Sequence, residues 1–120
     1  MTDPTTLARD YLALWNDDDA TSRRRRLADG WDPDARYADP MMAGEGYDGI
    51  AAMIEKAREG FPGHAFTLRG LPDGHGSFVR FSWTLTPAGG APVAHGTDVV
   101  RIEDGGRIAE VIGFLDGDVA

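Results

Sequence analysis

The segment from His95 to Leu115 constrains the fold more than any other, because it predicts a β-hairpin with an acid on its apolar face. Both arms are rich in β-branched and apolar side chains, and Asp104-Gly105-Gly106 between them suits a tight turn. Side chains alternate between the faces of a strand, so Asp98 is expected to share a face with Val100 and Ile102. We therefore predict that the Asp98 carboxyl points into an apolar interior.

A carboxyl group in such a place has two options. Burying it charged and unpaired costs free energy, so it either finds a partner or keeps its proton. A protonated acid can donate a hydrogen bond at neutral pH, which makes Asp98 a candidate functional group. The plainer alternative is that Asp98 only hydrogen bonds to the backbone or to Tyr11.

The first helix is predicted to begin at Pro4, which suits a first helical turn, with Thr2 or Asp3 as its cap. Its apolar side chains fall on one stripe, so Tyr11 is expected to be buried. The neighbours that share this stripe are Leu7, Leu14 and Trp15.

Two further helices are predicted. The acidic cluster Asp17-Asp18-Asp19 ends the first helix and caps the second, which stops at Gly30. The third is expected from Gly49 to Glu59 with Asp48 as its cap. The run Arg23–Arg26 points in every direction around the second helix, and nearby acids can neutralise it, so we interpret it as a solvated surface, with a subunit contact as the alternative.

A short strand is expected at Ala35–Asp39, after a turn at Asp32-Pro33. Pro40 ends this strand, since proline has no N–H for the ladder. Asp39 therefore lies at a strand end, beside the glycine-containing connection 41–47, where catalytic side chains often occur. The plainer interpretation is that Asp39 is only a turn residue.

From His64 onward apolar residues recur at every second position, which indicates strands. The segment Gly70–Ser77 is expected to be a loop, and Pro87–Pro92 turns the chain back toward the terminal hairpin. The alternating apolar residues are Phe66, Leu68, Val79, Phe81, Trp83 and Leu85.

These elements predict one α+β domain over residues 1–120. Three N-terminal helices are expected to pack on a strongly curved, mainly antiparallel sheet. Such a sheet, bent where Gly96 and Gly113 permit, forms a cone with an apolar pocket.

The composition excludes several classes of function. A net charge of −8 disfavours nucleic acid and anionic membranes, since both reward clustered positive charge. The sequence has no cysteine, and its histidines lack the spacing of a metal site, so we expect no metal and no cofactor. His64 and His75 are expected to be exposed. No basic and apolar leader or long apolar stretch is present, so we expect a cytoplasmic protein without membrane association.

The order of elements and three segments resemble the nuclear transport factor 2-like superfamily, most closely its SnoaL-like and ketosteroid-isomerase-like branches. The segments are the strand end Tyr37-Ala38-Asp39-Pro40, the loop and helix Gly44–Ile54, and the hairpin Gly96–Ile108. The resemblance covers nearly the whole chain. It implies the cone fold, and a superfamily whose members include enzymes, ligand binders and scaffolds.

The resemblance to ketosteroid isomerases also implies a site. Tyr11 on the first helix, Asp39 before proline, and Asp98 at the start of the penultimate strand match that family's three active-site positions. By this match Asp39 is a base that shuttles a proton next to a carbonyl. Tyr11 and protonated Asp98 would donate hydrogen bonds to the enolate oxygen. The plainer interpretation of Tyr11 is a core tyrosine whose hydroxyl is satisfied within the protein.

We therefore predict a pocket that binds a hydrophobic carbonyl compound, steroid-like or polyketide-like, and isomerises or cyclises it. The alternative is a noncatalytic ligand-binding or interaction module of the same fold. The residues expected to form the apolar wall are Trp15, Met41, Met42, Phe66, Phe81, Trp83 and Leu115.

A homodimer is expected from the resemblance and from the face of the sheet that points away from the helices. By simple alternation that face carries apolar side chains that can pair with a second copy. They are Val99, Ala109 and Val111.

Overall fold

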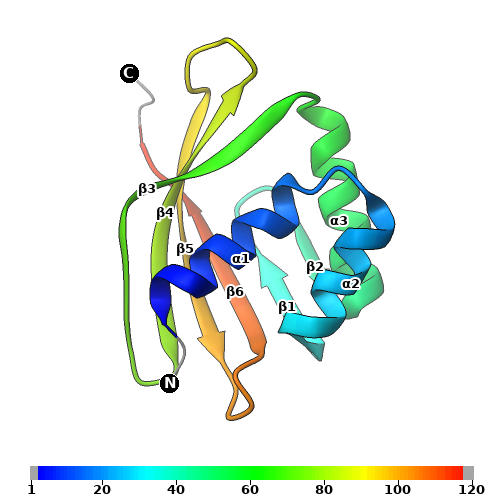
Figure 1. Ribbon diagram of the computed structural model, residues 1–120, viewed down its shortest axis with the longest axis vertical. Helices are drawn as coiled ribbons and strands as arrows, with labels where there is room; N and C mark the ends of the chain where they lie inside the picture. Colours follow the sequence, from blue (N-terminus) through cyan, green and yellow to red (C-terminus); the bar gives the residue numbers. More distant parts are fainter. Residues whose placement is uncertain (1–2, 118–120) are drawn as a thin grey trace.

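The computed structural model describes residues 3–117, which form three helices packed against one curled, open sheet of six strands (Figure 1). The predicted α+β cone is thus confirmed. The helices are α1 (Pro4–Asn16), α2 (Ala20–Gly30) and α3 (Gly46–Gly60). The strands are β1 (Trp31–Ala38), β2 (Ala43–Glu45), β3 (His64–His75), β4 (Phe78–Pro87), β5 (Ala94–Ile102) and β6 (Ile108–Leu115).

The sheet has the order β2-β1-β6-β5-β4-β3. Strands β3 to β6 form an antiparallel meander, as expected for a mainly antiparallel sheet, and β1 pairs with β2 antiparallel as well. Strand β1 lies parallel to β6, with Tyr37 opposite Val111 and Ala38 opposite Ile112. The sequence did not reveal this pairing, which connects the first strand to the last.

The helix ends follow the predicted capping chemistry in two cases. The Asp3 carboxylate accepts a hydrogen bond from the Thr6 amide at 2.9 Å, and the Asp19 carboxylate accepts one from the Ser22 amide at 3.3 Å. The prediction that Asp48 caps the third helix is wrong. Helix α3 starts earlier because β2 leads directly into it, so Asp48 lies in its first turn and forms an ion pair with Arg24.

Two predicted irregular segments belong to strands instead. Strand β1 begins at Trp31, and the segment Asp32-Pro33 falls in a gap in its pairing with β6, where the missing proline N–H breaks no ladder bond. Strand β3 continues to His75 with an irregularity between Arg69 and Asp73.

The inward placement of Asp98 is confirmed, since Asp98 is 3% exposed and Val100 is completely buried. The outward placement of Val111 is wrong, because Val111 is also completely buried. Ile102 pairs with Ile108 and Arg101 with Glu110, which leaves one extra residue in β6 and reverses the alternation beyond it.

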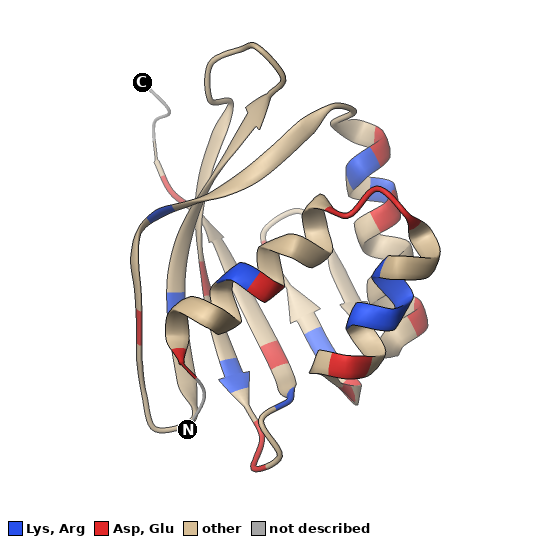
Figure 2. Cartoon of the chain, viewed as in Figure 1, with Lys and Arg blue, Asp and Glu red and all other residues tan. Residues whose placement is uncertain are grey.

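Acids next to α2 pair with two of its four arginines, Arg24 and Arg26, and Figure 2 shows the two kinds of charge side by side there. The predicted solvated surface does not include Arg23. Arg23 is buried and its Nη1 donates to the Asp17 carbonyl at 2.8 Å, while the Arg26 Nε lies 2.9 Å from the Asp17 carboxylate. Of the residues 3–117, no helix combines the length and the apolar character needed to cross a bilayer.

Candidate active site

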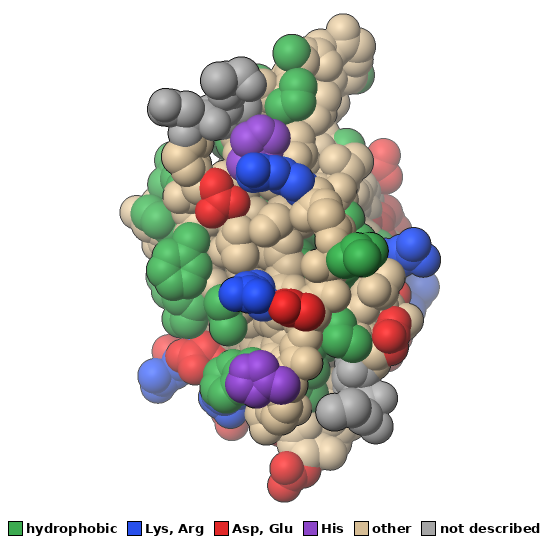
Figure 3. Space-filling view, turned by 90° about the vertical axis from the view of Figure 1, so that its left-hand side faces the viewer, with side chains coloured by type: hydrophobic (Ala, Val, Ile, Leu, Met, Phe, Trp, Pro, Cys, Tyr) green, Lys and Arg blue, Asp and Glu red, His purple; other side chains and the backbone are tan. Residues whose placement is uncertain are grey.

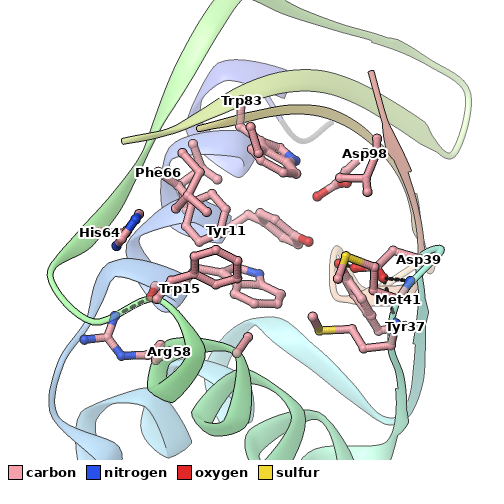
Figure 4. A pocket seen from close by; sticks show the side chains of 17 residues that line it. Tyr11, Trp15, Tyr37, Asp39, Met41, Arg58, His64, Phe66, Trp83 and Asp98 are labelled. Atoms are coloured by element: carbon pink, nitrogen blue, oxygen red, sulfur yellow. Dashed lines mark hydrogen bonds between the residues drawn. The ribbon is translucent and has the colours of Figure 1, made fainter. Parts of the chain in front are cut away.

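A cavity of about 160 Å³ lies between α1, the end of α3 and the sheet (Figure 4). It reaches the surface where partly exposed apolar residues line it. Most predicted site residues line this cavity: Tyr11, Trp15, Asp39, Met41, Met42, Phe66, Trp83, Asp98 and Leu115. Phe81 does not line it, and its ring instead packs in the core against Tyr11, with ring centroids 4.9 Å apart.

Helix α1 presents Tyr11 and Trp15 to the cavity from successive turns (Figure 4). Both side chains are buried, and Trp31 and Phe81 hold the Tyr11 ring at centroid distances of 5.9 and 4.9 Å. Within residues 3–117 neither the Tyr11 hydroxyl nor Trp15 Nε1 makes a hydrogen bond. Leaving a buried polar group unpaired costs about 1–3 kcal/mol, so these two donors indicate a ligand position.

Strand β5 carries Asp98 on the inner face, opposite Phe81 of β4 and Gly113 of β6. Burial raises the pKa of the Asp98 carboxyl to about 6. The Tyr11 hydroxyl and the Trp83 indole act in the opposite direction as nearby donors, although the Tyr11 hydroxyl is not placed to complete a hydrogen bond to this carboxyl. The charge of Asp39 raises the pKa of Asp98 further. Asp98 is therefore protonated below about pH 6 and mainly ionised above it.

Asp39, one residue after β1, accepts three hydrogen bonds. The Tyr37 hydroxyl donates to its Oδ2 at 2.6 Å, and the amides of Met41 and Met42 donate to its Oδ1 at 2.8 and 2.9 Å. Acceptance of three bonds suits an ionised carboxylate. The two amide bonds also give Asp39 a role in the turn, so the structural interpretation and the site coexist.

Tyr37 is a residue that the sequence analysis missed. It is 6% exposed and lines the cavity, and burial together with the charge of Asp98 raises its pKa far above the usual range. Its hydroxyl therefore stays protonated and donates to Asp39. The signal was the alternation of Ala35, Tyr37 and Asp39, which places all three on one face of the strand.

Gly113 allows the two acids to converge. A Cβ atom at this position would lie 2.9 Å from Asp98 Oδ1, 3.0 Å from Asp39 Cβ and 3.5 Å from the Tyr37 hydroxyl. The carboxyls therefore approach each other across a backbone that has no side chain. The parallel pairing of β1 with β6 brings Asp39 to this point.

An aromatic wall lines the cavity between the acids and its other end. The Phe66 ring lies between those of Trp15 and Trp83, at centroid distances of 5.5 and 5.0 Å. A Cβ atom on Gly96 would lie 2.1 Å from Trp83 Cζ2, so the indole packs directly on that glycine. The wall therefore depends on a glycine for its position.

The far end of the cavity is lined by Arg58 and His64 (Figure 4). Both side chains are half-buried, so the prediction that His64 is exposed is wrong. His64 Nδ1 lies 3.0 Å from the Pro62 carbonyl oxygen, and Arg58 Nη1 donates to the Trp15 carbonyl at 2.7 Å. Sequence patterning gave no sign that these residues belong to the site. Among residues 3–117 no group of three His, Asp or Glu side chains is placed to hold a metal.

Three helices packed on a curled, open sheet form the cone-like fold of the nuclear transport factor 2-like class. Within it, the model of the SnoaL-like domain matches residues 8–111, and the chain belongs to the SnoaL-like family. The resemblance found in the sequence is thus confirmed. Among proteins with curated functions, none matches this sequence.

Solved structures agree with this assignment. A protein from Agrobacterium tumefaciens str. C58, described as a candidate isomerase of the SnoaL-like family, is 55% identical, with a TM-score of 0.94 over 98% of this chain and 100% of its own. Two candidate polyketide cyclases share the fold. That from Jannaschia sp. CCS1 has 20% identity and a TM-score of 0.71 over 97% of this chain and 90% of its own. The protein from Sinorhizobium meliloti has 18% identity and a TM-score of 0.70 over 90% of this chain and 93% of its own.

The raised pKa of Asp98 predicts a pH-dependent effect of Asp98→Asn on stability. The folded protein keeps this proton up to about pH 6, whereas an unfolded chain loses it near the ordinary value of 3.8. The contribution of Asp98 to the unfolding free energy of the wild type is therefore fully present below pH 3.8 and is lost as the pH rises to about 6. The difference in unfolding free energy between Asp98→Asn and wild type should therefore change with pH. It should be about 2–3 kcal/mol more favourable to the variant at pH 7.5 than at pH 3.5. Urea unfolding at both pH values measures this, and a constant difference would contradict the burial argument.

Proposed function

We propose that this protein binds a small hydrophobic carbonyl compound in the cavity and isomerises or cyclises it by proton transfer. One observation carries the proposal: within residues 3–117 the buried donors of Tyr11 and Trp15 have no partners, and both side chains line an apolar cavity that also holds two acids. Cavities that are apolar with a few converging polar groups are typical ligand sites.

In this proposal Asp39 is the base. It takes a proton from the carbon next to the substrate carbonyl, and the C–H electron pair moves to form an enolate. Tyr11 and protonated Asp98 donate hydrogen bonds to the enolate oxygen as its charge develops. Asp39 then returns the proton to a different carbon, so isomerisation needs no other reactant. In cyclisation the enolate carbon instead attacks a second carbonyl of the same molecule, and the returned proton neutralises the new alkoxide.

Tyr37 would position the base. Its hydroxyl holds Asp39 Oδ2 while the two backbone amides hold Oδ1, so the carboxylate cannot rotate freely. A fixed base reacts faster because less ordering is needed at the transition state. The description of the 55% identical protein as a candidate isomerase supports this proposal, while the cyclases at 18 and 20% identity support the fold alone.

A noncatalytic ligand-binding module is the second candidate. The same three bonds to Asp39 favour it, because each carboxylate oxygen already has a donor within residues 3–117. Binding and catalysis are separated by testing the donors and the base independently.

Binding of 2-naphthol, whose phenol oxygen resembles an enolate, tests the donors. Below about pH 6, where Asp98 keeps its proton, Tyr11→Phe and Asp98→Ala should each weaken binding by about tenfold, the effect of one lost hydrogen bond. Ligand fluorescence measures the dissociation constants. Tyr47→Phe is the matched control, since the Tyr47 hydroxyl donates to the Trp31 carbonyl at 2.7 Å and does not line the cavity. Equal affinity in all variants would place the binding site elsewhere.

Conversion of a β,γ-unsaturated cyclic ketone to its conjugated isomer tests the base. Asp39→Asn should lower kcat by about 10²–10⁴-fold, the usual contribution of a general base, and leave 2-naphthol binding nearly unchanged. The ultraviolet absorbance of the conjugated product reports the rate. In wild type kcat/KM should fall as the pH rises through about 6, where Asp98 loses its proton. Asp29→Asn, an exposed acid outside this cavity, is the control. A wild type that binds 2-naphthol but never turns over would favour the binding module.

We also propose a homodimer formed through the outer face of the sheet. Hydrophobic side chains are grouped there beside charged ones (Figure 3). Val99 pairs with Ile112 across the strands, and Phe114 follows on the same face at 52% exposure. Burial of this apolar group against a second copy would remove it from water.

The dimer proposal predicts that Phe114→Glu shifts the protein to monomers. A charge at the centre of an apolar contact is costly to bury, so the dissociation constant should rise at least about a hundredfold. Sedimentation equilibrium over a range of concentrations measures it. Leu71→Glu is the control, because Leu71 is equally apolar and 93% exposed on β3. A wild type that remains monomeric at all concentrations would refute the dimer.

A further inference from the structure

The cavity has two chemically different ends. Asp39, Asp98 and Tyr37 lie at one end, whereas Arg58 and His64 lie at the other (Figure 4). The acids that line the cavity among the described residues are confined to the first end. A ligand that fills the cavity would therefore meet hydrogen-bond donors and a base at one end and a cation at the other.

Arg58 is the residue on which the inference rests. It lies in the last turn of α3, is half-buried, and forms no ion pair with any residue in the range 3–117. Six other arginines of this acidic chain each have a carboxylate within 4.0 Å: Arg24, Arg26, Arg36, Arg69, Arg80 and Arg101. Among the described residues Arg23 also lacks a carboxylate partner, but it is buried against the Asp17 carbonyl, whereas Arg58 keeps a half-buried guanidinium without an anion at the cavity.

Arg58 also has a structural role, which leaves most of its donors available. Its Nη1 donates to the Trp15 carbonyl at 2.7 Å, which ties the last turn of α1 to α3. This bond uses one of five guanidinium N–H groups and holds the side chain at the cavity. Guanidinium groups favour carboxylates because two parallel hydrogen bonds can form.

The size of the cavity limits the ligand. Its volume of about 160 Å³ is close to the ~150 Å³ of a cavity that accepts benzene, and below the ~300 Å³ of typical drug-sized sites. One or two rings therefore fit against the aromatic wall of Trp15, Phe66 and Trp83. A larger ligand would have to extend past the exposed residues at the opening, such as Met41 at 72% exposure.

We propose that the ligand is a compact hydrophobic carbonyl compound of one or two rings that carries an anionic group, such as a carboxylate, bound by Arg58. This inference rests on the proposed function, since it places the carbonyl oxygen at Tyr11 and the anion at the opposite end. It makes Arg58 a specificity-determining residue, because the neutral compound of the same shape leaves the guanidinium without its partner.

Two probes with the same rings test the proposal. Both 2-naphthol and 6-hydroxy-2-naphthoate present a phenol oxygen, and the second adds a carboxylate at the far end. Wild type should bind the naphthoate at least about tenfold more tightly, as expected for a charge-assisted hydrogen bond. Arg58→Gln keeps an amide donor for the Trp15 carbonyl but removes the charge, so it should bind both probes equally and keep the wild-type affinity for 2-naphthol.

The controls separate this inference from the proposed function. Arg25→Gln removes one exposed positive charge from α2 and should preserve the preference for the naphthoate. In wild type the side-chain Nε–H NMR signal of Arg58 should shift with the naphthoate and not with 2-naphthol, a readout that does not require a folded variant. If 2-naphthol binds through Tyr11 and Asp98 but the carboxylate adds no affinity, or adds it equally in Arg58→Gln, the anionic ligand is refuted and the proposed function stands. If neither probe binds, both fail.

Discussion

The candidate site depends on the parallel pairing of β1 with β6. This contact sets the end of β1 beside Gly113, and there Asp39 and Asp98 approach from the two sides of a residue that has no side chain. A Cβ atom at Gly113 would lie 2.9 Å from one acid and 3.0 Å from the other. Two acids far apart in the sequence therefore share one cavity because of a single strand register and a single glycine.

The different surroundings of the two acids divide their roles. Asp98 lies among apolar side chains, and burial raises its pKa to about 6, so it can hold a proton close to neutral pH. Asp39 instead accepts hydrogen bonds from Tyr37 and two amides, which suits a carboxylate. A site with one acid that can donate and one carboxylate that can accept follows from environment, since the two residues are chemically identical.

Sequence reasoning predicted what depends on local alternation and missed what depends on tertiary register. Asp98 was placed correctly because its hairpin is unambiguous. Val111 was placed wrongly because one extra residue in β6 reverses the alternation, and no residue type marks that bulge. Tyr37 could have been predicted from the sequence, because it lies two positions before Asp39 on the same face of the strand. Arg58 could not, because its position at the cavity depends on where the end of α1 meets α3.

The two unpaired donors lower the stability of the folded protein, and they also favour the binding of a ligand oxygen. The Tyr11 hydroxyl and Trp15 Nε1 are buried without partners in residues 3–117, a loss of about 1–3 kcal/mol each that phenylalanine or leucine would avoid. Aromatic packing holds Tyr11 rigid, with Trp31 and Phe81 at 5.9 and 4.9 Å between centroids, so the hydroxyl cannot turn away to find a partner. An oxygen that accepts from these donors recovers the lost free energy, and an oxygen that gains negative charge recovers more. Rigid, unsatisfied donors therefore favour a charged intermediate over its neutral precursor.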